Sequence, residues 1–115
     1  MSRLVQRRIR QLKSVYEQAR DVGVLLEFLQ AENRAYVRGM LAQQNARVLN
    51  QELLRDGNRV YVQVPPAFCQ RRADYLQSLC EGVLGHAVEV SIQHPAWGAS
   101  GACRIALNLP LGTGA

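Results

Sequence analysis

Cysteine and histidine side chains, which are the usual ligands of zinc and the nucleophile and base of thiol enzymes, gather in the second half of the chain. They are Cys69, Cys80, His86, His94 and Cys103. Structural zinc sites draw on closely spaced pairs such as CxxC, and these cysteines form no such pair. The sequence therefore predicts no metal site and no cofactor, with a soft zinc site as the weaker alternative.

The same residues do not form the pattern of a catalytic site. Thiol catalysis needs a positioned base and a third group that orients the base, and neither can be identified here. Cys80 and Cys103 fall on the apolar faces of an expected helix and an expected strand, where free cysteine acts as a small hydrophobe. We therefore predict a non-enzymatic protein with reduced thiols. Reduced thiols, together with an N-terminus that lacks an apolar signal region, favour a cytoplasmic location.

The loop HPAWGASG between two expected strands contains Trp97, the only tryptophan of the chain. An aromatic side chain on a loop of small residues often serves recognition, so Trp97 is a candidate pocket lid or interface anchor. The alternative is that Trp97 covers the end of the sheet and fills a gap in the core. The small residues 98–101 lack the lysine and the following helix of a phosphate-binding P-loop.

Positive charge is concentrated at the N-terminus. Residues 1–20 contain six basic side chains and one acidic side chain, and the rest of the chain contains eight of each. Such a segment attracts phosphate groups, which makes nucleic acid a candidate partner. Arg71 and Arg72 could extend the surface, although no alternation of arginine with aromatic residues marks a stacking platform. The predicted basic patch comprises Arg3, Arg7, Arg8, Arg10 and Lys13.

Apolar residues of the same segment recur at helical spacing. They are Leu4 or Val5, Ile9, Leu12, Tyr16 and Ala19. A lone helix of this length is marginal in water, so the stripe needs burial. We predict that it packs on the next helix or on the same helix of a second chain in a homodimer. Phosphate groups or a membrane surface are the alternatives for its charged side.

Length and composition indicate a single globular domain. The chain has 115 residues, of which 48% are apolar and 20% charged, and this suffices for one hydrophobic core. No apolar run approaches the roughly 20 residues that span a bilayer. We divide the chain into a basic amphipathic helix at 1–22, a single α+β domain at 23–110 and a disordered tail at 111–115.

Periodicity predicts the elements of the domain. Gly23 should end the first helix, and a second helical pattern follows it. RVLNQELL and RVYVQVPP read as a hairpin with its turn at Asp56-Gly57, although residues 47–54 also suit a helix. A helix at 67–84 should end at Gly85, before two alternating strands at 88–92 and 103–109. The predicted fold class is α+β: two N-terminal helices, then β-β-α-β-β, with an antiparallel sheet covered on one face by helices.

Residues of the second half also follow a family pattern, which is a helix ending in leucine and glycine, a valine-glutamate-valine strand, and a loop closing on cysteine and arginine. The matching residues are Leu76, Leu79, Val83-Leu84-Gly85, Val88-Glu89-Val90, Gly98 and Cys103-Arg104-Ile105. Residues 47–109 therefore resemble the 4-vinyl reductase (4VR) domain family of predicted hydrocarbon-binding domains, which is related to vesicle-tethering TRAPP subunits. Members with a metal signature carry a cysteine and an acidic residue where this chain has Pro95 and Ile92.

The resemblance implies a ligand-binding or protein-interaction module with a regulatory or assembly role. The expected site is an apolar pocket between the helix at 67–84 and the sheet, filled by a small hydrophobic ligand or a protein partner. A packed core made of the same residues is the alternative, and a nucleic-acid-associated or assembly role of the basic helix is the second functional hypothesis. The expected pocket residues are Leu76, Leu79, Cys80, Val83, Val90, Ile92, Trp97, Ile105 and Leu107.

Overall fold

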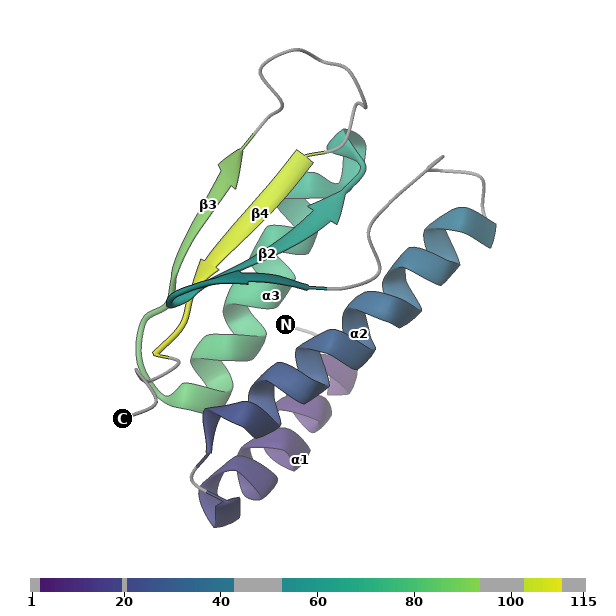
Figure 1. Ribbon diagram of the computed structural model, residues 1–115. Helices are drawn as coiled ribbons and strands as arrows, with labels where there is room; N and C mark the ends of the chain where they lie inside the picture. Colours follow the sequence, from purple (N-terminus) through teal and green to yellow (C-terminus); the bar gives the residue numbers. More distant parts are fainter. Residues whose placement is uncertain (1–2, 20, 43–52, 94–102, 111–115) are drawn as a thin grey trace.

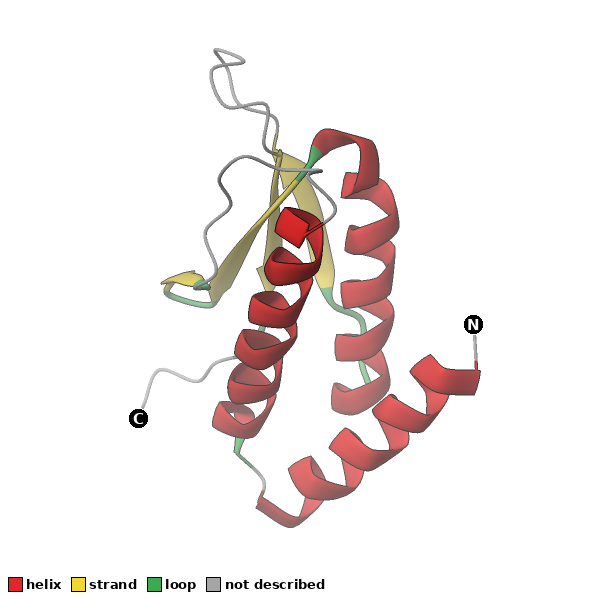
Figure 2. Cartoon of the chain, turned by 90° about the vertical axis from the view of Figure 1, so that its right-hand side faces the viewer, coloured by secondary structure: helices red, strands yellow, loops and turns green. Residues whose placement is uncertain are grey.

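The computed structural model describes residues 3–19, 21–42, 53–93 and 103–110. In chain order its elements are α1 (Arg3–Ala19), α2 (Val22–Ala42), β1 (Leu54–Asp56), β2 (Arg59–Val64), the 3-10 turn η1 (Pro66–Phe68), α3 (Cys69–Leu84), β3 (Glu89–Gln93) and β4 (Cys103–Asn108). The strands form one antiparallel sheet in the order β1-β2-β4-β3, with the helices on one side of it (Figures 1 and 2). The predicted fold class is confirmed.

Alternation along the strands separates a core face from an outer face of the sheet. Val60, Val62 and Val64 of β2 point inward and are at most 5% exposed. In β4 the inward residues include Ile105 and Leu107, which pair with Val62 and Val60. These apolar side chains form one core with the inner side of α3, and their burial supplies the main force that holds helix and sheet together.

The β1–β2 hairpin turns one residue later than predicted. Asp56 pairs with Arg59, so the two-residue loop consists of Gly57 and Asn58 and not of Asp56-Gly57. Gly57 has φ of +61°, a left-handed conformation that tight hairpin loops require and glycine adopts without strain. The first strand is only Leu54–Asp56, and most of the strand predicted at 47–54 lies outside the described residues.

The expected helix stop at Gly23 is wrong. Helix α2 begins at Val22, and Gly23 lies in its first turn. Asp21 caps this helix: its Oδ1 atom accepts a hydrogen bond from the Gly23 N–H at 2.9 Å, and its carbonyl oxygen accepts one from Val24 at 3.1 Å. The boundary between α1 and α2 is therefore explained by Asp21, which is the N-cap of α2, and not by Gly23.

Helix α3 has the boundaries that the sequence predicts to within two residues. Pro65 and Pro66 end β2, and Gly85 closes the helix in a left-handed conformation with φ of +80°. The chain then returns to the sheet through Val88. The Val88 N–H donates to Glu81 Oε2 at 2.9 Å, and its carbonyl accepts from Gln77 Nε2 at 3.0 Å. Two side chains of α3 thus position the start of β3.

Helix α1 packs on α3 and α2 of its own chain. Leu12 is buried in the common core, and Ile9 and Tyr16 pack against it. Of the two alternatives at the start of the stripe, Val5 is half-buried and Leu4 is 61% exposed, whereas Ala19 at its end is exposed. The middle of the α1 stripe is therefore covered within the chain. Across the described ranges, no helix is both long and apolar enough to cross a membrane.

Two helical glycines give a matched test of the α1–α3 contact. A Cβ atom at Gly82 would lie 2.7 Å from Ile9 Cγ2, whereas one at Gly39 would meet nothing within 4 Å. We expect Gly39→Ala to raise the free energy of unfolding by about 0.5–1 kcal/mol through helix propensity. Gly82→Ala should instead lower it by about 1 kcal/mol, because Ile9 must move away from α3. Urea unfolding followed by circular dichroism measures both.

The Ile9→Ala background is the control for this comparison. There the clash is removed, so Gly82→Ala should become neutral or stabilising. Equal stabilisation by Gly82→Ala and Gly39→Ala in the wild-type background would show that α1 does not cross α3 at this point.

Candidate functional site

The residues expected to line an apolar pocket lie in the core of the protein. Leu79, Cys80 and Ile105 are fully buried, and Leu76, Val83 and Leu107 are at most 2% exposed. Val90 and Ile92 are partly buried and pack against them, while Trp97 lies outside the described residues. The described ones among them belong to the hydrophobic core between the helices and the sheet. The hollows described below have other linings.

The three cysteines are buried free thiols. Burial raises the pKa of Cys69 to about 11, and a hydrogen bond with the Cys103 thiol adds to this shift. Burial also raises the pKa of Cys80 to about 12, with a smaller contribution from the negative charge of Glu81. Cys69 and Cys80 are therefore protonated at neutral pH, which is the opposite of the lowered pKa that activates a nucleophilic thiol.

Metal-ligating side chains do not converge in the described part of the chain. No group of three His, Cys, Asp or Glu residues lies within reach of a common ion there. The His86 ring is exposed, and its Nδ1 atom lies 3.0 Å from the carbonyl oxygen of Ala87. His94 lies outside the described residues.

The predicted basic patch divides into two parts. Arg3, Arg7, Arg10 and Lys13 are exposed on α1. Arg8 instead reaches across to α2 and α3, where its Nη1 atom donates to Glu32 Oε1 and, at 3.3 Å, to the Tyr75 hydroxyl. These contacts raise the pKa of Arg8, the hydrogen bond with Tyr75 first and the charge of Glu32 second.

Glu32 is the centre of a polar cluster between the three helices. The Tyr75 hydroxyl donates to Glu32 Oε1 at 3.2 Å, and Arg72 Nη2 lies 3.8 Å from Glu32 Oε2. We call Arg8, Glu32, Tyr36, Arg72 and Tyr75 the Glu32 cluster. The cluster's long side chains connect α2 and α3, because Tyr75 of α3 donates to Glu32 of α2 and Arg72 of α3 stacks on Tyr36 of α2.

Arg72 occupies an unusual position in this cluster. Its guanidinium carbon lies 4.1 Å from the centre of the Tyr36 ring and 5.0 Å from that of Tyr75, so the cation stacks on two aromatic side chains. The Arg72 side chain is only 12% exposed. Burial lowers the pKa of Arg72, and the charge of Glu32 offsets part of this shift. Within the described part of the chain its polar contact is the 3.8 Å ion pair with Glu32, and this distance is too long for a hydrogen bond.

A hollow of about 360 Å³ opens beside Arg72, between the C-terminal half of α2 and the start of α3. Its walls are largely apolar or aromatic, with two arginines at the α3 end. The first turn of α3 contains no acidic residue, and its cap Phe68 makes no side-chain hydrogen bond, so the positive end of the helix dipole is not neutralised there. The lining residues are Tyr36, Met40, Phe68, Arg71, Arg72 and Tyr75.

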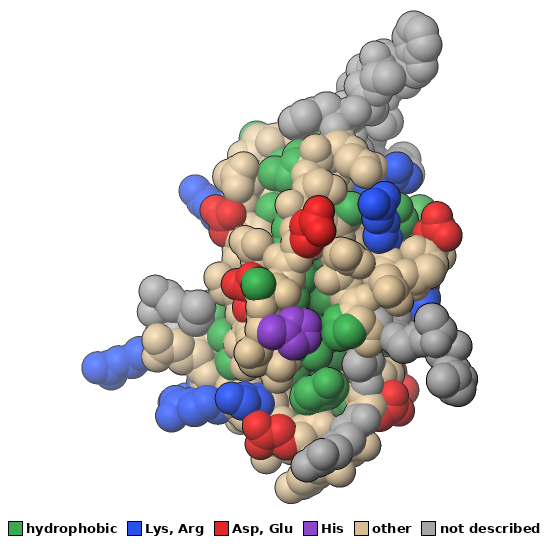
Figure 3. Space-filling view, turned by 90° about the vertical axis from the view of Figure 1, so that its left-hand side faces the viewer, with side chains coloured by type: hydrophobic (Ala, Val, Ile, Leu, Met, Phe, Trp, Pro, Cys, Tyr) green, Lys and Arg blue, Asp and Glu red, His purple; other side chains and the backbone are tan. Residues whose placement is uncertain are grey.

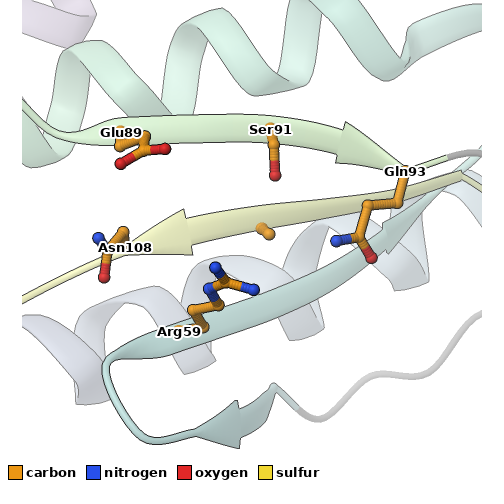
Figure 4. A pocket seen from close by; sticks show the side chains of 6 residues that line it. Arg59, Glu89, Ser91, Gln93 and Asn108 are labelled. Atoms are coloured by element: carbon orange, nitrogen blue, oxygen red, sulfur yellow. The ribbon is translucent and has the colours of Figure 1, made fainter.

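A second hollow, of about 260 Å³, lies on the outer face of the sheet (Figure 4). Its floor is Ala106, whose neighbours across the strands are Tyr61 and Ser91. Arg104 stacks over the Tyr61 ring at 4.5 Å and donates to Gln93 Oε1 at 2.8 Å. The hollow is polar, and its side chains are Arg59, Glu89, Ser91, Gln93, Ala106 and Asn108.

The sequence patterns did not predict the Glu32 cluster or the hollow beside it. A local signal was present, because Glu32 and Tyr36 are four residues apart on one helix and Arg72 and Tyr75 three apart on another. Nothing in these spacings shows that the two pairs meet. Comparisons with protein-family models, curated proteins and solved structures find no match to this chain.

The buried thiols predict a loss of stability at alkaline pH. Above the ordinary thiol pKa of 9.0 the unfolded chain releases protons that Cys69 and Cys80 retain in the folded state. Unfolding is therefore favoured as pH rises from about 9 towards the folded values, by up to about 1.4 kcal/mol per pH unit for each thiol. Urea unfolding between about pH 8 and about pH 10 measures this slope.

Cys80→Ala is the variant that isolates one thiol. It should lower stability at every pH because it leaves a cavity, and it should also reduce the alkaline slope. The tyrosines titrate alike in both proteins, so the difference in slope belongs to Cys80. Identical slopes would show that the Cys80 thiol ionises as readily in the folded protein as in the unfolded chain.

Proposed function

We propose that this protein is a non-catalytic binding module that holds an organic anion in the hollow between α2 and α3. The observation that carries the proposal is the Arg72 guanidinium. It is largely buried and stacked on two tyrosines, it lines the hollow, and its ion pair with Glu32 is long. A carboxylate, sulfonate or phosphate in the hollow would give this cation the short hydrogen bonds that it lacks among the described residues.

Local charge favours an acidic ligand. Arg8, Arg71 and Arg72 surround the region, and Glu32 is the only acidic member of the Glu32 cluster. The N-terminus of α3 adds the positive end of a sixteen-residue helix. Arg8 and Arg71 are exposed, but the Arg72 side chain is only 12% exposed, and electrostatic attraction to a charge so far removed from water is stronger than at an open surface.

The apolar walls select the rest of the ligand. Phe68 and Met40, with the rings of Tyr36 and Tyr75, suit an aromatic or aliphatic body attached to the anionic group. Burial raises the pKa of both tyrosines, so their hydroxyls are neutral at pH 7. The lining contains no His, Cys, Asp or Glu to act as nucleophile or base, which supports binding over catalysis at this hollow.

We further propose that residues 47–109 belong to the 4VR-like class and that the protein acts in the cytoplasm. The supporting order is helix, Gly85, strand β3 and the Cys103-Arg104-Ile105 start of β4. Buried free thiols suit a reducing compartment. The family resemblance implies a hydrophobic ligand between α3 and the sheet. The site proposed here differs in two respects, because it lies between α3 and α2 and because its ligand carries a negative charge.

The hollow can be tested with a pair of fluorescent probes that share a ring system. Anilinonaphthalene sulfonate is an anion, and phenylnaphthylamine is its uncharged counterpart. We expect the sulfonate to bind the wild-type protein and Arg72→Gln to weaken this binding by about tenfold or more, because a buried charge-assisted contact is lost. Phenylnaphthylamine should bind both proteins with similar affinity. Fluorescence titration gives the dissociation constants.

Arg104→Gln is the matched control, because Arg104 also stacks on a tyrosine but lies on the outer face of the sheet. It should leave sulfonate binding unchanged. Near-ultraviolet circular dichroism checks that each variant is folded. Equal affinity of wild type and Arg72→Gln for the sulfonate would contradict the proposal, as would equal losses in Arg72→Gln and Arg104→Gln.

A second candidate function, binding of nucleic acid, is supported by the exposed basic residues of α1. Arg7 and Arg10 are the test positions, because Arg8 is held by Glu32 and Tyr75. If this function is present, single-stranded oligonucleotide binding should fall steeply with salt, and Arg7→Glu with Arg10→Glu should weaken it by about tenfold or more at low salt. If oligonucleotide binding depends neither on salt nor on these substitutions, the arginines of α1 are an ordinary solvated surface.

A further inference from the structure

Strand β3 is an edge strand of the sheet. It follows β4 at the end of the strand order, and β4 is its only partner in the part of the chain that the structure describes (Figure 1). Alternate backbone N–H and C=O groups of an edge strand point away from the sheet, and these groups can pair with another strand. The other edge, β1, has only three residues, whereas β3 has five.

We infer that β3 pairs antiparallel with β3 of a second copy of this chain, around a two-fold axis at Ser91. The register of the two strands favours this pairing. In a two-fold antiparallel pairing, the numbers of any two opposed residues add up to the same sum. Even-numbered and odd-numbered residues of β3 point to opposite faces, so an odd sum would set the core face of one sheet beside the outer face of the other. Only even sums keep the faces continuous. Centring the axis on Ser91 pairs all five residues of β3, whereas centring it on Val90 or Ile92 pairs fewer.

The side chains fit this register on both faces. On the core face Val90 meets Ile92 of the second copy, and both residues are only partly buried in the single chain. On the outer face Glu89 meets Gln93 of the second copy, and Ser91 meets Ser91. The strand has a single charged residue, so no like charges face each other across the axis. An edge strand in a monomer usually carries inward charges, prolines or bulges that prevent such pairing, and EVSIQ carries none of them.

The position of the basic segment also permits this contact. Helix α1 packs on α2 and α3, away from the β3 edge. Figure 3 views the molecule from the side on which β3 lies, and lysine and arginine side chains lie mainly towards the margins of that view. Repulsion between the basic α1 segments of the two chains therefore acts at a distance from the axis, where salt screens it.

The dimer would join the two polar hollows of the outer face. Glu89, Ser91 and Gln93 contribute to this hollow from β3 itself (Figure 4). Pairing places the same three residues of the second copy beside them, so one polar surface would cross an eight-stranded sheet. The anion-binding hollow lies between α2 and α3 and not at β3, so the two proposals can fail independently.

Sedimentation equilibrium of the full chain and of Ser91→Glu tests the pairing. Ser91 is exposed, so the substitution is expected to leave the single chain folded. In the dimer it would gather four carboxylates around the axis, two from position 91 and two from Glu89, and should raise the dimer dissociation constant by about tenfold or more. Mixing Ser91→Glu with Ser91→Lys should restore a dimer of the two variants. Gln63→Glu, the same charge change on the outer face of β2, is the control and should leave the dimer intact.

Cross-linking supplies a measurement of the register. Opposed residues of an antiparallel pair have Cα atoms about 4.5–5.5 Å apart, within the range that a disulfide spans. Mild oxidation of Ser91→Cys should give a covalent dimer, and Gln63→Cys should not; the native cysteines are buried. A wild-type chain that stays monomeric up to about 1 mM would overturn the inference. So would a dimer that Ser91→Glu leaves unchanged, or equal cross-linking at positions 63 and 91.

Discussion

The contact between the inner face of α3 and the sheet determines the position of everything else in this structure. Leu76, Leu79 and Val83 of α3 share one buried core with the inward residues of the sheet, and α3 contacts the sheet at β3 and β4. This burial fixes the axis and the rotation of α3, because an apolar stripe can face the sheet in only one orientation. This orientation also determines what the other sides of α3 contact. Its start faces α2, Gly82 lies against Ile9 of α1, and Gln77 and Glu81 hydrogen-bond to Val88 at the entry to β3.

The Glu32 cluster is polar, although packed helices usually meet through apolar side chains. A guanidinium as enclosed as that of Arg72 is costly to desolvate, and replacing buried ion pairs by apolar side chains is often neutral or stabilising. The two tyrosine rings and Glu32 offset part of this cost, but the ion pair is long. This balance supports the proposed function, in which an anion in the hollow would give the Arg72 cation the short contacts that it lacks among the described residues.

The two sides of the sheet have different roles in this interpretation. The core face binds the helices through apolar burial, while the outer face presents an ordered array of polar side chains around Ala106. The sheet is also asymmetric from edge to edge, since β1 is short and β3 is long enough for a strand to pair with. Dimerisation through β3 would extend both properties, because the core face and the outer face of each copy continue into the other.

Local sequence determined the elements and much of their burial. Alternation placed Val60, Val62 and Val64 on one face, and Gly85 marked the end of α3, because these features depend on backbone geometry over a few residues. The boundary at Asp21 and the shifted hairpin turn needed the actual hydrogen bonds and strand pairing. The candidate site was decided by tertiary structure alone. Tyr36 and Arg72 meet only because α3 packs on the sheet and α2 packs beside it, and no pattern within either helix encodes a contact between residues so far apart in the chain.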